Sequence, residues 1–250
     1  MKSKLLLGVA AAFVLSAGMA QAAPSAAIQA AVADKGRPEA DTKRDADRKP
    51  AEMLEFTGVK PGDKVADFIP GGGYFTRIFA KAVGPTGKVY AVSNPPPPNA
   101  TTPPAIQAIA ADPQYGNITF VPIPPGGALK LPEPVDVFWT SQNYHDLYLT
   151  RLNLDVPTVV KGIYDSVKPG GVFVVLDHVA KPGADVVSTA NTLHRIDPAA
   201  VRKTVEAAGF KFESESKVLA NASDDHTKGV FDPALRGHTD QFIYKFRKPK

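Results

Sequence analysis

Each of the five histidines stands close to a carboxylate in the sequence, and these pairs are the residues best suited to chemistry. An imidazole and a carboxylate can act as a general base with its orienting group, and both bind zinc and similar ions. No spacing among them matches a compact motif such as H-E-x-x-H, so loop hydrogen bonding is the simpler interpretation and no metal ligand is predicted. A metal-dependent hydrolase or metal-binding module stays open as an alternative. The pairs are His145-Asp146, Asp177-His178, His194 with Asp197, Asp225-His226 and His238 with Asp240.

The first of these pairs belongs to a polar run that follows an apolar segment at residues 135–139. His145 is the best candidate for a general base, and Asp146 could orient it. Asn143 and Tyr144 could hold a polar group of a substrate. The alternative is a helix-capping side chain with a surface histidine beside it.

A glycine-rich turn follows another apolar segment, residues 65–69. Such a turn lets a ligand approach the backbone, and the helix after it offers unpaired N–H groups and a positive dipole end. The functional interpretation of Asp67, Gly71 and Gly73 is therefore a ligand cradle. The alternative is a tight turn that holds no ligand.

The elements that must position these residues alternate between strands and helices. Residues 65–69 and 88–92 are predicted strands, and the apolar residues between them recur at helical spacing. A helix between two strands forms a βαβ unit, which implies a parallel pair and an α/β sheet. Further strands are expected at 118–123, 135–139, 172–176, 210–219 and 241–247, and further helices at 47–57, 105–111, 155–167 and from 198 onward.

The composition is that of a globular protein, with 44% hydrophobic and 22% charged residues in a chain of 250. It excludes a collagen-like, disordered or multi-span membrane protein. The absence of cysteine excludes disulfides, iron–sulfur clusters and thiol nucleophiles. Lysine and arginine number 29 against 25 aspartate and glutamate, so no nucleic-acid partner is expected.

Residues 1–22 have the pattern of a secretory signal peptide. Lys2 and Lys4 supply positive charge, and residues 5–15 form an apolar run that is too short to span a bilayer. Residues 20–22 read Ala-Gln-Ala, which is a typical cleavage site. We therefore expect a bacterial protein that is exported to the periplasm or secreted.

The mature protein would begin near Ala23 and would contain no integral membrane segment. Residues 23–46 are rich in alanine, aspartate, lysine and arginine, so we expect them to form a flexible N-terminal segment. Residues 47–250 are then expected to form one domain.

Several segments resemble motifs of the class I S-adenosylmethionine-dependent methyltransferases. A narrower resemblance is to an exported, poorly characterised branch of predicted methyltransferases. The family motifs are matched by residues 65–76 (motif I), by 167–171 with 176–178 (the LKPGG turn and fifth strand), and by 194–197 with 207–210 (the AGF turn). The branch is matched by residues 143–146, 224–226, 231–233 and 236–240.

The resemblance covers about residues 48–248 and implies a Rossmann-like methyltransferase fold. This fold has a seven-stranded, mostly parallel sheet with helices on both faces and an antiparallel last strand. The resemblance also implies S-adenosylmethionine as cofactor, over the carboxyl ends of the first strands, and a small-molecule methyl acceptor. The implied catalytic residues, beside the transferred methyl, are Asn143, Tyr144, His145 and Asp146; the implied cofactor-binding residues are Asp67, Gly71, Gly73, Ser93, Asn94 and Asp136.

Two positions depart from the family pattern. Motif I usually has a glycine where this chain has Ile69, and the second strand usually ends in an acid that binds both ribose hydroxyls. Here that strand ends in Ser93 and Asn94. Because charge-assisted hydrogen bonds are about twice as strong as neutral ones, we expect weaker cofactor binding. A non-catalytic periplasmic ligand-binding protein on the same fold is therefore an alternative.

Overall fold

The computed structural model describes residues 24–96 and 99–250. The predicted signal peptide, residues 1–22, lies outside the described residues. Within them, no helix is both long enough and apolar enough to cross a bilayer.

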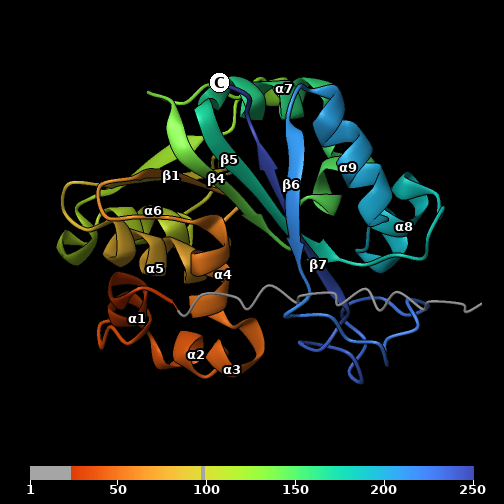
Figure 1. Cartoon of the computed structure of the whole chain (residues 1–250), viewed down its shortest axis with the longest axis horizontal. Helices are drawn as coiled ribbons and strands as arrows, with labels where there is room; N and C mark the ends of the chain where they lie inside the picture. Colours follow the sequence, from red (N-terminus) through yellow and green to blue (C-terminus); the bar gives the residue numbers. More distant parts are fainter. Residues whose placement is uncertain (1–23, 97–98) are drawn as a thin grey trace, which may run out of the picture.

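One seven-stranded sheet forms the centre of the fold (Figure 1). Its first five strands are parallel, and β7 runs antiparallel to both of its neighbours, β5 and β6. The predicted α/β methyltransferase-type sheet is therefore confirmed. In spatial order the strands are β3 (Ile118–Pro122), β2 (Lys88–Ser93), β1 (Lys64–Phe68), β4 (Val135–Ser141), β5 (Val167–His178), β7 (Gln241–Arg247) and β6 (Lys211–Ser216).

Helices cover both faces of this sheet because its strands are apolar on both sides (Figure 1). In β1, Val65 packs in the cluster on one face, while Ala66 and Phe68 pack in the cluster on the other. The first face is covered by α1 (Ala26–Val32), α4 (Pro50–Thr57), α5 (Tyr74–Val83) and α6 (Ala105–Ala110). The second is covered by α7 (Val156–Ser166) and α9 (Pro198–Ala207), with α8 (Val186–Leu193) beside the loop after β4.

The N-terminal segment is helical where the sequence predicts a flexible one. Three short helices, α1, α2 (Glu39–Thr42) and α3 (Asp45–Arg48), form there. Ile28 of α1 is buried in the core cluster that contains α5. Ion pairs hold the other two helices: Arg37 with Asp45 at 2.6 Å and Arg77 with Asp41 at 2.9 Å. The burial of Ile28 and these ion pairs thus order a segment whose composition predicted flexibility.

The strand order reverses between β1 and β4. In an open parallel sheet, ligands bind at the carboxyl ends of the strands at such a switch point. Here the loops after β1, β4 and β5 meet at this edge, and the N-terminal helices α2 and α3 lie against the same edge (Figure 1). The topology therefore brings the glycine turn, the run 143–146 and the end of β5 together.

Candidate active site

The turn after β1 begins with a buried carboxylate. Asp67 is 2% exposed, and the hydroxyl of Thr76 on α5 donates to its Oδ2 at 2.6 Å. Burial raises the pKa of Asp67 to about 7, although the Thr76 hydrogen bond and the positive charge of Arg48 both act to lower it. With a pKa of about 7, the carboxyl group of Asp67 can be ionised or protonated near neutral pH, and in either state it can form hydrogen bonds at the start of the turn.

The turn itself contains a branched residue in the left-handed region. Ile69 has φ +55°, a conformation that is rare for a β-branched side chain. Its N–H donates to the carbonyl of Val92 at 2.7 Å, and its carbonyl accepts from Asn143. Two hydrogen bonds to neighbouring strands or loops therefore hold Ile69 in an unfavourable conformation.

Two glycines of the turn answer different requirements. Gly71, with φ +55°, faces open space, since a Cβ built there meets no atom within 4 Å. Gly73, with φ +77°, is the N-cap of α5, and a Cβ there would lie 2.4 Å from Cδ1 of Ile109. Gly71 thus leaves room for a ligand, while Gly73 allows close packing against α6.

The loop after β4 places the four predicted catalytic residues in different surroundings. Asn143 lines the cavity described below, and its Nδ2 donates to the carbonyls of Ile69 at 2.8 Å and Ser141 at 2.6 Å. Tyr144 is 1% exposed and packs in the core beside Tyr148 and Phe173. Asn143 therefore braces the turn after β1, and the ring of Tyr144 anchors the loop to the core.

His145 is fixed by Asp177 at the end of β5. The Nδ1 of His145 lies 2.8 Å from Asp177 Oδ1, and the backbone N–H of His145 donates to Oδ2 at 2.8 Å. Asp177 also accepts from the N–H of His178. Burial acts to raise the pKa of Asp177, but its hydrogen bonds and the attraction of His145 lower it, so it is ionised. Nδ1 of His145 consequently carries a hydrogen.

The same carboxylate sets the charge state of the ring. Burial acts to lower the pKa of His145, but the attraction and hydrogen bond of Asp177 raise it overall. Asp177 is absent from the predicted catalytic residues. Its position in an Asp-His pair at the end of a predicted central strand is the signal that could have identified it.

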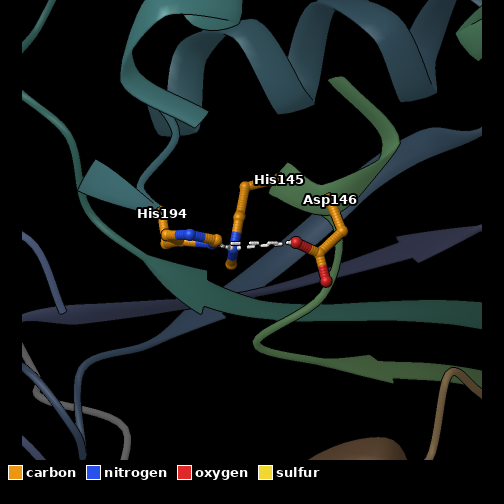
Figure 2. Close-up of side chains that lie close together, drawn as sticks. All are labelled: His145, Asp146 and His194. Carbon is orange, nitrogen blue, oxygen red and sulfur yellow. Dashed lines mark hydrogen bonds and ion pairs between the residues drawn. The ribbon is translucent and has the colours of Figure 1, made fainter. Parts of the chain in front are cut away.

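The Nε2 atom of His145 faces two further ligand-type atoms (Figure 2). It lies 3.3 Å from Nδ1 of His194 and 3.3 Å from Oδ1 of Asp146, and the last two atoms are 3.9 Å apart. His194 ends α8 with φ +55°, and its ring packs against Phe231. Asp177 orients the ring through Nδ1, whereas Asp146 lies near the opposite ring nitrogen, Nε2. His194, which is 49 residues further along the chain, also belongs to the site.

These groups border a mainly polar cavity of about 480 Å³. Asp67, Gly71 and Asn143 lie on its wall together with His145 and His194. Arg44 and Arg48 of the N-terminal segment line it as well. One cavity thus contains both the turn after β1 and the histidine cluster.

Arg48 is the most buried cation of this wall. Burial lowers its pKa to about 10, and its Nη2 donates to the hydroxyl of Ser141 at 3.0 Å. Its guanidinium lies 4.5 Å from the centre of the Tyr74 ring, within the range of a cation–π contact. The helix α3 therefore contributes a fixed positive charge to the cavity wall.

An apolar cavity of about 240 Å³ lies on the other side of Ile69, between the loops after β2 and β3. Ile69 and Asn94 both line it. Ser93 is half-buried at the end of β2, and its carbonyl accepts from the N–H of Ile123. Ile69 thus separates an apolar cavity from the polar one.

Asp136 lies at the opposite edge of the sheet from these cavities. It is the second residue of β4, at the amino end of the strand. It accepts hydrogen bonds from the N–H of Lys64 at 2.8 Å and from the ammonium of Lys168 at 2.7 Å. The structure therefore does not bring Asp136 together with the other predicted cofactor-binding residues.

Comparison with known proteins finds sequence likeness to methyltransferases. The chain is 27% identical over 202 residues to the ubiquinone/menaquinone biosynthesis C-methyltransferase UbiE of Ectopseudomonas mendocina, which covers 77% of this chain and 65% of that protein. It is 29% identical over 126 residues to the 2-phytyl-1,4-naphtoquinone methyltransferase of Synechococcus elongatus, which covers 50% and 49%. The chain spans less than two thirds of the length of these relatives. No family model matches the chain.

Solved structures show the same fold at low identity. The structure of a SAM-dependent methyltransferase from Aquifex aeolicus matches with a TM-score of 0.52 at 16% identity, over 85% of this chain and 99% of that one. The 1,6-didemethyltoxoflavin-N1-methyltransferase of Burkholderia thailandensis, solved with bound 1,6-didemethyltoxoflavin and S-adenosylhomocysteine, matches with a TM-score of 0.53 at 17% identity, over 85% and 82%.

Proposed function

We propose that this chain, which has the fold of the class I S-adenosylmethionine-dependent methyltransferases and is similar to them in sequence, binds S-adenosylmethionine and methylates a small molecule. One observation carries the proposal: the turn after β1, with Asp67 beneath it, shares a cavity with His145. That cavity lies at the switch point of the sheet, where this class of fold binds its ligands.

The residues of the turn fit this cofactor. Gly71 faces open space, so the backbone can approach a ligand there, and the buried Asp67 lies next to it. The apolar cavity beyond Ile69 suits an adenine ring, with Asn94 at its wall. Ser93 and Asn94 would then meet the ribose through neutral hydrogen bonds only.

The bound cofactor supplies an electrophilic methyl group on a sulfonium. The protein has to orient the acceptor and, where the acceptor carries a proton, to remove it. His145 presents Nε2 to the cavity because Asp177 binds its Nδ1, so the proton would move to Nε2. Asn143 acts as a positioning residue, since it braces the turn after β1.

Small-molecule acceptors are favoured by the size of the cavity, about 480 Å³, whose wall includes residues of the N-terminal helices. The names of the two sequence relatives make quinones and their phenolic precursors the first compounds to assay. Nucleic acid is not proposed, given the small charge excess of the chain.

Export is part of the proposal and rests on the sequence of residues 1–22. The basic start, the short apolar run and the Ala-Gln-Ala site favour cleavage after Ala22 and release into the periplasm. Radiolabelled or epitope-tagged protein should appear in the periplasmic fraction in a form shortened by these residues. A full-length cytoplasmic product would contradict export.

A second candidate function is ligand binding without catalysis. It is favoured by Ile69, which separates the two cavities, and by the lack of an acid at the end of β2. Native mass spectrometry of protein purified from the periplasm distinguishes the two. A tightly held ligand other than the cofactor, with no turnover, supports the binding protein.

Methyl incorporation from labelled S-adenosylmethionine tests the enzyme. Purified protein is incubated with small-molecule extracts and with quinone precursors. We expect transfer that is abolished by His145→Ala, which removes the proton acceptor, and by Gly71→Trp, which fills the cradle. His238→Ala, an exposed histidine outside the cavity, should retain it. Activity that persists in both site variants would overturn the assignment.

A further inference from the structure

We propose that His145, Asp146 and His194 bind a divalent transition-metal ion, zinc or a close neighbour in the first row. The ligand atoms are Nε2 of His145, Oδ1 of Asp146 and Nδ1 of His194 (Figure 2). The metal proposal shares His145 with the proposed methyl transfer but does not depend on the turn after β1: with an ion bound, Nε2 is a ligand and is not free to accept a proton. The spacing of the histidines and carboxylates in the sequence matched no compact metal motif. The reason is that the third ligand, His194, lies at the end of α8, far along the chain from His145 and Asp146.

The distances among the three atoms match those around a small ion. Zinc lies about 2.0–2.2 Å from nitrogen and oxygen ligands, so neighbouring ligands of a tetrahedral site are roughly 3.3–3.5 Å apart. Two of the three distances are 3.3 Å and the third is 3.9 Å. Only the separation of His194 from Asp146 has to shorten, and both side chains are at the cavity wall.

The hydrogen bonds of Asp177 prepare His145 as a ligand. Nδ1 of His145 donates to Asp177, which leaves the lone pair of a neutral ring on Nε2. Nδ1 of His194 lies 3.3 Å from that nitrogen in hydrogen-bond geometry, and Oδ1 of Asp146 lies 3.3 Å from the same atom. An ion placed among the three atoms would take two imidazole nitrogens and one carboxylate oxygen as ligands, a donor set that suits zinc. A carboxylate behind a metal-binding histidine is also the usual arrangement that fixes its tautomer and orientation.

Burial and charge fit a catalytic rather than a purely structural site. The side chain of His145 is 3% exposed, while those of Asp146 and His194 are 22% and 31% exposed. Three protein ligands leave a tetrahedral ion with one position, which here faces the cavity. Water or an oxygen of a bound small molecule could occupy it.

Two arginines of the cavity bear on this place. The charge of Arg151 acts on both Asp146 and His194, while Arg48 is held elsewhere on the wall. Arg48 is engaged with Ser141 and lies over the Tyr74 ring, and Asp67 shares the cavity with it. The alternative occupant of the cluster is a proton: Nδ1–H of His194 donating to Nε2 of His145, or a doubly protonated His145. Metal titration distinguishes an ion from a proton.

The test uses untagged full-length protein that has been treated with a chelator and dialysed. Calorimetric titration with Zn²⁺ and visible spectra with Co²⁺ report the binding. We expect one ion per chain with micromolar or tighter affinity, and cobalt bands typical of low coordination number. Mg²⁺ should not compete, because imidazole ligands disfavour it.

Two variants and one control locate the site. His194→Asn keeps a residue that tolerates the left-handed conformation of this helix end, so folding should be retained. Asp146→Asn removes the charged ligand. Each should weaken Zn²⁺ binding at least 10-fold, with far-UV circular dichroism unchanged. His226→Ala removes another His–Asp pair, with Asp240 at 2.9 Å, which has no third ligand-type group among the residues that the structure describes. This variant should bind Zn²⁺ like the wild type.

Binding of less than one ion per two chains, or wild-type affinity in His194→Asn, would overturn the metal site. Cofactor titration of the metal-free protein is run alongside. If cofactor binds and zinc does not, only the metal site fails. If zinc binds and cofactor does not, the proposed methyltransferase function fails and the metal site stands.

Discussion

Nδ2 of Asn143 donates a hydrogen bond to the carbonyl of Ile69 at 2.8 Å, so the loop after β4 holds the turn after β1 in place. The same amide group donates to Ser141 at 2.6 Å. The side-chain amide of Asn143 thus donates both of its hydrogen bonds to main-chain carbonyls. The loop after β4 and the turn after β1 are thus joined by a hydrogen bond, so a substitution in one should shift the conformation of the other.

Replacement of Asn143 should therefore loosen the cavity. Asn143→Asp removes the donor and sets a carboxylate against two carbonyl oxygens. The lost hydrogen bonds and the repulsion should cost about 1–3 kcal/mol of unfolding free energy. Urea denaturation measures this cost, and calorimetry should show weaker cofactor binding. An unfolding curve superimposable on that of the wild type would contradict the bracing role.

Ile69 provides a second test, because its backbone conformation suits glycine. Ile69→Gly relieves a left-handed conformation that costs a residue with a Cβ about 1–2 kcal/mol. Ile69→Ala removes the same packing but keeps the Cβ. We predict that the glycine variant is the more stable of the two by about 1 kcal/mol in urea denaturation.

The same pair tests the role of the side chain as a wall between the two cavities. Both variants connect the apolar and polar cavities, so both should bind S-adenosylmethionine more tightly than the wild type. Weaker binding in both would mean that the Ile69 side chain contacts the cofactor favourably instead of obstructing it.

The pH dependence of stability should carry the signature of Asp67. Burial raises its pKa from 3.8 to about 7, so between these values the folded state binds more protons than the unfolded state. Stability therefore falls as pH rises through this window, and the contribution of this group is at most about 4 kcal/mol. Asp67→Asn should flatten the profile from pH 4 to 8 and lose cofactor affinity. An unchanged profile would show that Asp67 is ionised throughout.

A buried ion pair holds the loop between β6 and β7 to the segment that carries His194. Arg195 donates to both oxygens of Asp224, at 2.8 and 3.1 Å, and both side chains are fully buried. Asp224→Asn leaves an unpaired buried charge and should cost about 3–5 kcal/mol of unfolding free energy. Asp225→Asn, at an exposed neighbouring position, is the matched control and should change little. Equal effects of the two variants would contradict the assignment.

Sequence patterns predicted the sheet well because its strands are continuous apolar runs between turn signals. The segment 172–176 lies in β5, and the glycine turn lies between β1 and α5 as expected. In a parallel sheet the carboxyl ends of neighbouring strands lie at the same edge. Asp67, near the end of β1, and residues 143–146, after β4, therefore lie close together.

Other features depend on contacts that no local pattern encodes. The helices α1 to α3 are held by pairs such as Arg37 with Asp45 and by the burial of Ile28. His194 reaches His145 from the C-terminal end of α8, a helix that was not predicted and that ends in this left-handed residue. Asp136 was expected at the cofactor but lies at the other end of its strand. Each depends on tertiary placement and not on spacing.

Titration calorimetry with S-adenosylmethionine and S-adenosylhomocysteine tests the central claim, that the turn after β1 is a cofactor site. We predict binding at micromolar affinity, about −8 kcal/mol, that is weakened at least 10-fold by Asp67→Asn and lost in Gly71→Trp. Absence of heat up to millimolar concentrations of both ligands, from protein that is folded by circular dichroism, would contradict it.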